Sequence, residues 1–220
     1  RLAFSNEQVE ALRRWPAFKG MPPTFFEELR RFRFQGDVFA VPEGTVAFPG
    51  ETLVRVTAPL PQAQWVETFL LASLGYPTLV ASKAARMVLA AGGKPLFEFG
   101  ARRAHGPQAG LLAARAAYLA GFEATSHVEA ARRLNVPCVG TMAHSWVQSF
   151  PSEAEAFAAY ARVFPESTTL LVDTYDTLEG VRRAAAIAPP SSAIRIDSGD
   201  LAALAPQARA ILDEAGRGDV

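Results

Sequence analysis

An apolar run that ends in polar residues occurs at Leu170-Leu171-Val172-Asp173-Thr174-Tyr175-Asp176. Three more segments share this design, and they span residues 96–106, 139–146 and 193–200. Helix-like sequence separates the four segments, and alternating strands and helices predict a parallel sheet. In a βα barrel the C-terminal ends of the strands meet on one face, which carries the chemistry. We therefore expect arginines, histidines and aspartates from distant positions to converge on one pocket, suited to a substrate rich in phosphate and hydroxyl groups.

The alternation begins after Gly92-Gly93-Lys94-Pro95, a turn-forming run that we interpret as a domain boundary. A barrel of this type needs about eight strands, and fewer are found. Residues 94–220 are therefore predicted to form an incomplete, irregular TIM-like α/β barrel, with sequence missing at the C-terminus and at the N-terminus. The expected strands are 96–99, 136–140, 169–173 and 193–197, with a short apolar piece at 121–124, and the expected helices are 107–120, 126–134, 153–163, 176–187 and 200–215.

Residues 1–93 are predicted to form a smaller N-terminal α/β domain. Ser5, with Gln8 three residues later, predicts a capped helix that ends at Pro16. A second helix is expected from about residue 23 to residue 32. Two long helices, 62–74 and 78–91, are expected on either side of Gly75-Tyr76-Pro77. The strand-like runs of a small β module lie at 37–41, 45–48 and 53–57.

Composition excludes several classes of protein. The 220 residues contain 22 basic and 22 acidic side chains, and zero net charge argues against a nucleic-acid partner, because backbone binding needs a basic excess. No apolar run approaches the ~18 residues that a membrane span needs. The single cysteine, Cys138, excludes a disulfide framework and favours a cytoplasmic location. We expect Cys138 to be a small, buried packing residue.

Carboxylates follow two of the expected strands. The run Asp197-Ser198-Gly199-Asp200 could bind ribose hydroxyls or Mg²⁺, which prefers oxygen ligands. The alternative is a turn in which Ser198 or Asp200 caps the next helix. Asp173 closes another buried run, where a carboxylate is costly unless something pairs with it. There the alternative is that Thr174 or Asp176 caps the next helix.

Cationic and aromatic side chains follow the other two strands. Arg102 and Arg103 suit a diphosphate, because each guanidinium can bind two oxygens, although a surface salt bridge is the alternative. His144 could be a base or a phosphoryl acceptor, or it could be structural. Phe99 could stack on a flat ring, or it could be a core aromatic. The weaker histidine candidates are His105 and His127.

Taken together, the four segments resemble the nicotinate phosphoribosyltransferase family. The similarity extends to Phe34–Thr45 and Ala84–Gly93, and so covers nearly the whole chain. It implies a type II phosphoribosyltransferase fold, which is an irregular α/β barrel with an α/β domain from the N-terminal part. It also implies a salvage reaction of NAD biosynthesis, in which nicotinate and phosphoribosyl pyrophosphate give nicotinate mononucleotide and pyrophosphate. In this family the reaction is coupled to hydrolysis of ATP through a phosphorylated histidine, Mg²⁺ is required, and homodimers share their active sites.

The resemblance assigns catalytic roles to three residues. His144 matches the phosphorylated histidine. Asp197 matches the carboxylate at the ribose hydroxyls, and Asp173 matches another carboxylate of the ribose and magnesium region. Asp173 and Asp197 are therefore also candidate metal ligands.

The resemblance also assigns substrate contacts. Phe99 matches the aromatic that stacks on the pyridine ring, Arg102 the arginine near the donor phosphates, and Arg195 the arginine near the pyridine substituent. His127 stands where the family pattern has asparagine, and glycine-rich loops for the 5′-phosphate are expected beyond residue 220. The weaker substrate-binding assignments are Arg103, Thr125, Ser126, Ser145 and Asp200.

Three alternatives remain open. The quinolinate enzyme shares the fold but does not use ATP, and the Gly-Thr-Met-Ala-His-Ser setting of His144 argues against it. The nicotinamide enzyme is disfavoured because residues 98–103 are closer to the nicotinate pattern. The third alternative is a non-catalytic barrel fragment with a binding or assembly role, and the retained reactive residues argue against it for the parent protein.

Overall fold

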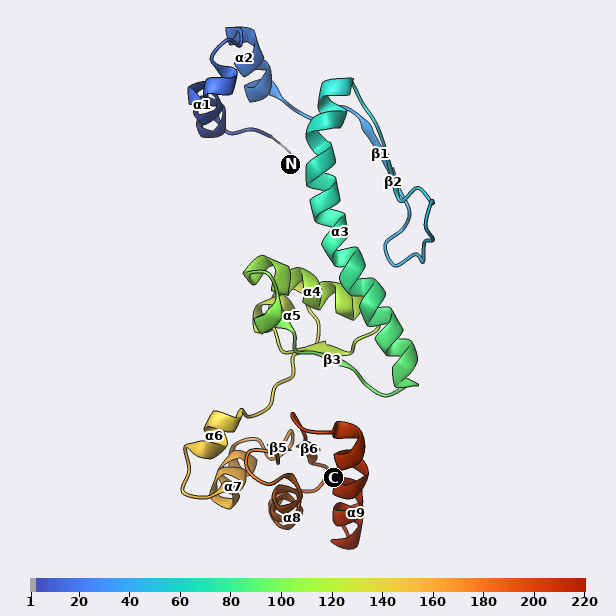
Figure 1. Ribbon diagram of the computed structural model, residues 1–220, viewed down its shortest axis with the longest axis vertical. Coiled ribbons are helices and arrows are strands. Elements are labelled where there is room, and N and C mark those ends of the chain that lie inside the picture. Colours follow the sequence, from blue (N-terminus) through green and yellow to red (C-terminus); the bar gives the residue numbers. More distant parts are fainter. Residues whose placement is uncertain (1–2) are drawn as a thin grey trace. The chain divides into compact units, whose positions relative to one another are not determined.

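The computed structural model describes residues 3–220, which form a chain of mixed α and β structure (Figure 1). The chain divides into two compact units, one that ends at Cys138 and one that spans Val139–Val220. The boundary predicted after residue 93 lies inside the first unit, and as a division between an N-terminal domain and a barrel it stays a prediction. Among residues 3–220, no helix combines the length and the hydrophobicity that crossing a lipid bilayer requires.

The first unit opens with two short helices, α1 (Asn6–Arg14) and α2 (Pro23–Arg31), joined through the 3-10 turn η1 (Pro16–Phe18). The predicted capping box is confirmed. The backbone N–H of Gln8 donates to Ser5 Oγ over 3.1 Å, and the backbone N–H of Ser5 donates to Gln8 Oε1 over 2.8 Å. Both helices turn apolar side chains toward each other. The buried cluster between them consists of Val9, Phe26 and Leu29.

A β-hairpin follows, made of β1 (Asp37–Ala40) and β2 (Val54–Thr57) in antiparallel pairing. The strand predicted at residues 45–48 is wrong, because this run belongs to the loop between β1 and β2. Gly44 and Gly50 on either side of it adopt left-handed φ angles of 87° and 90°. These turns leave the short run without a neighbouring strand among the described residues, so its apolar sequence has no ladder to join.

Helix α3 (Leu60–Ala91) is continuous over 32 residues, so the break predicted at Pro77 is wrong. A proline inside a helix removes a hydrogen bond and costs about 3 kcal/mol. Packing along both halves offsets that cost. In the first half, Trp65 contacts aromatic rings that flank the N-terminal helices. In the second half, Ala84 joins an apolar cluster with helix α4 (Pro107–Leu119).

The parallel pairing predicted after residue 94 is confirmed in the first unit, where β3 (Phe97–Glu98) pairs with β4 (Ala124–Thr125). The strand predicted at 136–140 is reduced to a single bridge between Thr125 and Cys138. The chain leaves the sheet directly after this bridge. Cys138 is consequently exposed, and its expected burial is wrong. The other elements here are η2 (Ala101–Arg103) and α5 (Val128–Leu134).

The second unit is built on the parallel pair β5 (Thr169–Leu171) and β6 (Ala193–Arg195), with Thr169 opposite Ala193. Leu170, Leu171 and Val172 are fully buried, as expected for a parallel strand covered on both faces. In the described residues, the parallel strands of each unit form only a short pair, and closure of the sheet into a barrel stays a prediction. The helices are α6 (His144–Gln148), α7 (Glu153–Val163), α8 (Thr177–Ile187) and α9 (Leu201–Glu214).

Candidate active site

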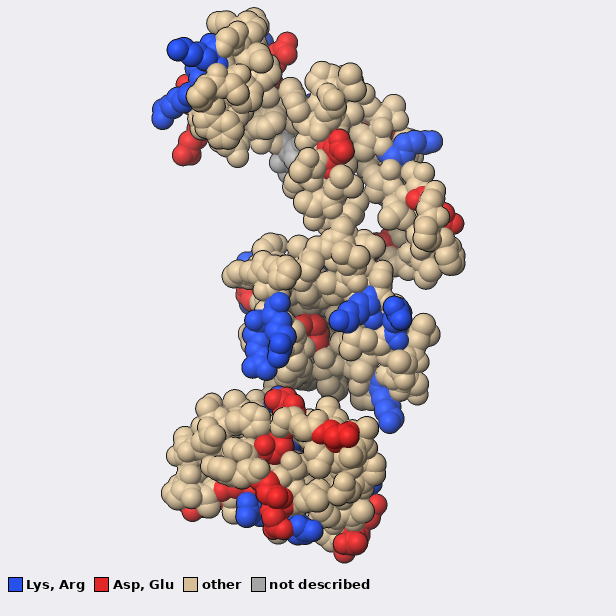
Figure 2. Space-filling model, viewed as in Figure 1, with Lys and Arg blue, Asp and Glu red and all other residues tan. Residues whose placement is uncertain are grey.

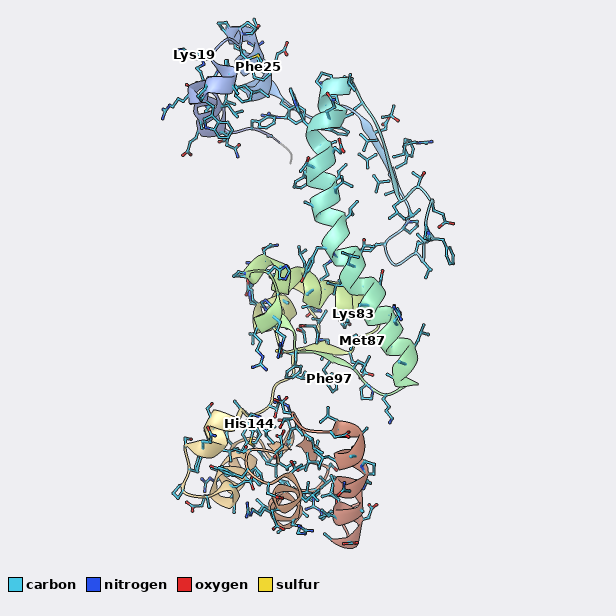
Figure 3. The ribbon with its side chains drawn as sticks, viewed as in Figure 1. Lys19, Phe25, Lys83, Met87, Phe97 and His144 are labelled. Atoms are coloured by element: carbon cyan, nitrogen blue, oxygen red, sulfur yellow. The ribbon has the colours of Figure 1, made fainter. Side chains whose placement is uncertain are left out.

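His144 is the first residue of α6, a short helix that the sequence did not predict (Figure 3). Its ring lies beside two side chains that follow neighbouring strands. Nδ1 of His144 is 3.2 Å from Oγ1 of Thr174, which follows β5. Nε2 of His144 is 3.5 Å from Oδ2 of Asp197, which follows β6. Parallel pairing of β5 with β6 explains the convergence, because the strands end at the same edge of their sheet.

Asp197 forms an ion pair with Arg195, the last residue of β6. The guanidinium of Arg195 also donates to the carbonyl oxygen of Met142 over 3.4 Å, which links β6 to the segment before His144. The hydrogen bond from Arg195 lowers the pKa of Asp197, and the nearby His144 acts in the same direction. Asp197 is therefore a carboxylate at neutral pH. The side chains of His144 and Asp197 are 38% and 34% exposed, so both can meet a ligand.

Asp173 fixes the loop that carries Asp197. Its Oδ2 accepts the backbone N–H of Asp197 over 2.9 Å and the hydroxyl of Ser198 over 2.6 Å. Asp173 is only 9% exposed, and its Oδ1 is buried with no hydrogen-bond partner among the described residues. A buried carboxylate with this pattern holds the ends of β5 and β6 together.

Two other aspartates that follow β5 and β6 cap helices and do not contact His144. Asp200 caps α9 by accepting the backbone N–H of Ala203 over 3.1 Å. Asp176 caps α8 in the same way through Glu179, over 2.9 Å. The contacts of both aspartates are those of helix caps, which the sequence analysis gave as the alternative to a binding role. Ser145 is exposed on α6.

The predicted residues of the first unit gather around the end of β3. Phe99 and Arg103 line a cavity of about 320 Å³. Lys83 and Met87 of α3 line it from the helix side, together with Phe97 (Figure 3). Phe99 is 43% exposed, so the alternative of a core aromatic is wrong. Arg102 lies in η2 and is also exposed.

Thr125 is buried and its hydroxyl is occupied. It donates to Oε2 of Glu98 over 2.7 Å and accepts the backbone N–H of His127 over 3.0 Å. Oε1 of Glu98 accepts the backbone N–H of Gly100 over 2.5 Å, which shapes the turn before Arg102. The backbone N–H of Ser126 donates to the carbonyl oxygen of Glu98 over 2.9 Å. Thr125 thus supports the end of β3 rather than offering a free hydroxyl.

The structure also answers what His127 does where the family pattern has asparagine. It is the N-cap of α5, and its Nδ1 accepts the backbone N–H of Ala130 over 3.3 Å. Asparagine is among the best N-cap residues because its side-chain oxygen makes the same bond. Imidazole therefore replaces the amide as a cap, and nothing in this contact is catalytic.

We expect His127→Asn to unfold at nearly the same urea concentration as the wild type, and His127→Ala to be less stable by about 0.5–2 kcal/mol. Loss of a capping acceptor has that typical effect. Equilibrium urea unfolding checks it, with His105→Ala as a control, because His105 is exposed and outside any helix. Equal losses in His127→Asn and His127→Ala would show that the ring packs rather than caps.

Three residues of these clusters were not predicted as site residues. Thr174 and Ser198 were named only within strand-end motifs and as possible helix caps, and Glu98 was named only within a strand and the family-like segment 98–103. The signal available for Thr174 and Ser198 was their position directly after a strand-end aspartate. The signal for Glu98 was a charged residue between two aromatics in a short strand, which requires a buried partner.

Magnesium would need a carboxylate oxygen that is free to bind it. No group of three or more His, Cys, Asp or Glu side chains that could hold an ion occurs in the described part of the chain. Mg²⁺ is commonly held by one or two carboxylates with substrate phosphates and water, so one accessible acid is enough. Asp197 is the more accessible candidate, because its side chain is 34% exposed, although Oδ1 is paired with Arg195 and a metal ion would have to bind through Oδ2. Asp173 does not fit in this arrangement, because Oδ2 accepts two hydrogen bonds and Oδ1 is buried.

The net charge of the chain is zero, but basic and acidic residues are distributed unevenly between the two units. The first unit has 16 basic and 11 acidic residues, and the second has 6 basic and 11 acidic residues. On the face shown in Figure 2, basic side chains gather over the α3–α5 part of the first unit, and acidic side chains are more frequent on the second. Arg102 and Arg103 lie in the more basic first unit, and Asp173 and Asp197 lie in the more acidic second unit. Convergence of the two groups on one pocket stays a prediction.

Two protein-family models match the chain. One describes the N-terminal domain of nicotinate phosphoribosyltransferase and matches residues 1–75, and the other describes the nicotinate phosphoribosyltransferase family and matches residues 95–215. Nicotinate phosphoribosyltransferase pncB2 of Mycobacterium tuberculosis is 52% identical over 198 residues, which cover 87% of this chain and 42% of that protein. The resemblance seen in the motifs is thereby confirmed.

Solved structures of related enzymes also resemble this chain. The crystal structure of human nicotinic acid phosphoribosyltransferase matches with a TM-score of 0.85 and 33% identity, over 97% of this chain and 54% of that one. The structure of nicotinate-nucleotide pyrophosphorylase from Pyrococcus furiosus matches with a TM-score of 0.76 and 28% identity, over 84% of this chain and 49% of that one. The chain spans about half the length of the relatives that it matches.

Proposed function

The chain belongs to the nicotinate phosphoribosyltransferase family, and we propose that the protein transfers a phosphoribosyl group to nicotinate. Nicotinate and phosphoribosyl pyrophosphate give nicotinate mononucleotide and pyrophosphate, a salvage step of NAD biosynthesis. Hydrolysis of ATP to ADP and phosphate is coupled to it through a phosphohistidine. The observation that carries this proposal is the cluster of His144, Asp197 and Arg195, held together at the ends of β5 and β6.

The chemistry of ribosyl transfer explains the two kinds of residue. Positive charge builds on the anomeric carbon while pyrophosphate departs, so cations must hold the leaving group. Arg102 and Arg103 suit that role, because they are exposed at the basic strand end of the first unit. Asp197 suits the ribose hydroxyls, because it is a partly exposed carboxylate. Phe99, which is partly exposed beside the cavity, supplies a flat surface for the pyridine ring.

His144 is the phosphoryl acceptor in this proposal. A neutral imidazole is a good nucleophile toward phosphorus and forms a phosphoenzyme. Its partly exposed ring and its place between Thr174 and Asp197 support the assignment. A phosphoryl group on His144 would add negative charge near the donor site, and its binding energy could favour binding of the sugar donor and drive an otherwise reversible transfer.

Several further features belong to the same proposal. Mg²⁺ would be held by Asp197 together with the donor phosphates, and it would neutralise the charge of the leaving pyrophosphate. The fold would be completed as a type II barrel. The protein would act in the cytoplasm as a homodimer with shared active sites. Val46 and Phe48, which are 79% and 68% exposed on the loop between β1 and β2, support a surface that a partner covers.

The test is to incubate the full-length protein with nicotinate, phosphoribosyl pyrophosphate, Mg²⁺ and ATP, and to measure nicotinate mononucleotide and ADP. Nicotinamide and quinolinate in place of nicotinate are the matched controls. We expect the mononucleotide from nicotinate, formation of ADP in step with it, and little product from the other two bases. Product from quinolinate without ATP would assign the protein to the quinolinate reaction, and no product from any base would support a binding role.

A further inference from the structure

Three acidic side chains are buried in the described part of the chain, and they are Glu98, Glu153 and Asp173. Both carboxylate oxygens of Glu98 accept hydrogen bonds. Glu153 and Asp173 differ from Glu98, because Oε1 of Glu153 and Oδ1 of Asp173 are buried without a hydrogen-bond partner among residues 3–220. Buried polar atoms in native proteins are nearly always paired, so these two oxygens require an explanation.

Glu153 and Asp173 belong to one buried region of the second unit. Glu153 is the first residue of α7, and Phe157, one turn later, packs in the same apolar cluster as Val172, which precedes Asp173. The side chain of Glu153 is 1% exposed, and its Oε2 accepts a hydrogen bond from Arg183 of α8 over 2.7 Å. The two acids are close enough for the charge of Asp173 to act on Glu153.

The surroundings of Glu153 favour its protonated form. Burial is the main cause that raises its pKa, Arg183 lowers it, and the negative charges of Asp173 and of Asp176, the N-cap of α8, raise it again. Helix α6 also packs against α7, and its titratable side chain, His144, has its ring at the ends of β5 and β6 instead. The net effect is a pKa above the ordinary value for a glutamate.

We propose that Glu153 is a pH-sensitive positioning residue: its protonated carboxyl allows Asp173 to hold the loop of Asp197, and its ionised carboxyl loosens that loop. A protonated carboxyl has an O–H to donate, and it removes one of two buried negative charges. When Glu153 loses its proton, two carboxylates repel each other in an interior with little water, and neither can donate to the other. Opening of the loop returns Asp173 to water, which weakens the repulsion.

The pH dependence of stability tests the proposal. Because the pKa of Glu153 is raised in the folded protein, its stabilising contribution is present below the unfolded pKa and is lost as the pH rises through the folded pKa. Glu153→Gln keeps the shape of the side chain and imitates the protonated form at every pH. We expect the full-length variant and the wild type to have nearly the same Tm at about pH 4.5, close to the ordinary pKa of glutamate. At about pH 8 the Tm of the variant should be about 2–6 °C higher.

The backbone N–H of Asp197 reports on the loop itself, because it donates to Oδ2 of Asp173 over 2.9 Å. Hydrogen exchange of this amide is compared between the wild type and Glu153→Gln at the same pH, so the intrinsic pH dependence of exchange cancels. At the higher pH we expect about 10-fold slower exchange in the variant, because a hydrogen bond to a charged acceptor is strengthened. At the lower pH the two rates should coincide. Glu155→Gln is the matched control, because Glu155 is exposed in the same turn of α7, and it should neither raise the Tm nor slow this exchange.

Three results would overturn the proposal. A Glu153→Gln protein that is less stable than the wild type at the higher pH, with a difference that closes in acid, would make Glu153 an ordinary ionised partner of Arg183. Equal exchange of the Asp197 amide in both proteins at both pH values would show that Glu153 does not act on the loop. A Glu153→Gln protein that does not fold would show that an uncharged side chain is not accepted at this position. None of these measurements needs substrate, so they decide the role of Glu153 even if the proposed ribosyl transfer is not observed.

Discussion

We expect His144→Asn to abolish ATP hydrolysis and phosphoenzyme formation while the protein stays folded. Asparagine is close to imidazole in size and can hydrogen bond, but it cannot carry a phosphoryl group as a stable intermediate. The side chain of His144 is 38% exposed, so the substitution leaves no large cavity. Ribosyl transfer should continue without coupling, but more slowly. The tightening of donor binding by ATP should also disappear.

The measurement is acid-labile, base-stable label from γ-labelled ATP, compared between the wild type and the variant. His105→Asn is the matched control, since His105 is exposed and outside the cluster around His144. It should keep full labelling. Label that survives in His144→Asn would place the phosphoryl acceptor elsewhere, with His105 or His127 as the next candidates among the three histidines of the chain.

The largest loss of stability is expected for Gly180→Ala. Gly180 is buried in α8 where the helix meets the end of β5, and a Cβ there would overlap the carbonyl oxygen of Val172. Overpacking of a core typically costs 1–3 kcal/mol, and occasionally more. Here the obstacle is backbone rather than a flexible side chain, so we expect at least about 3 kcal/mol.

Thermal unfolding and the activity assay test this. A loss of that size should lower the Tm by about 6–12 °C, because a domain of this size class loses 2–4 °C per kcal/mol. Activity should fall as well, because Val172 precedes Asp173, which holds the loop of Asp197. Gly75→Ala is the control: Gly75 is also helical but has open space around it, so alanine should stabilise the helix by about 0.5–1 kcal/mol. A Gly180→Ala protein as stable as the wild type would show that α8 can move without cost.

Local patterns were sufficient for much of the framework. The Ser5–Gln8 capping box and the helix at 153–163 follow from short-range signals, and the alternation of strands and helices predicted that the strands after residue 94 pair in parallel. The errors arose where a local signal met a tertiary contact. Pro77 predicted a break, but packing along both halves of α3 keeps one helix. Residues 45–48 had a strand pattern but no strand beside them in the described chain.

The sequence by itself determined which residues end the strands, and hence which side chains can reach one edge of the sheet. It also determined the family, because the order of the motifs is specific even where each motif is not. Only the tertiary structure decided what each side chain does there. Asp200 and His127 cap helices, Asp173 anchors a loop, and Thr174 holds the ring of His144. The reason is physical: apolar periodicity is a local property, whereas a hydrogen bond between residues 30 positions apart exists only after their strands have paired.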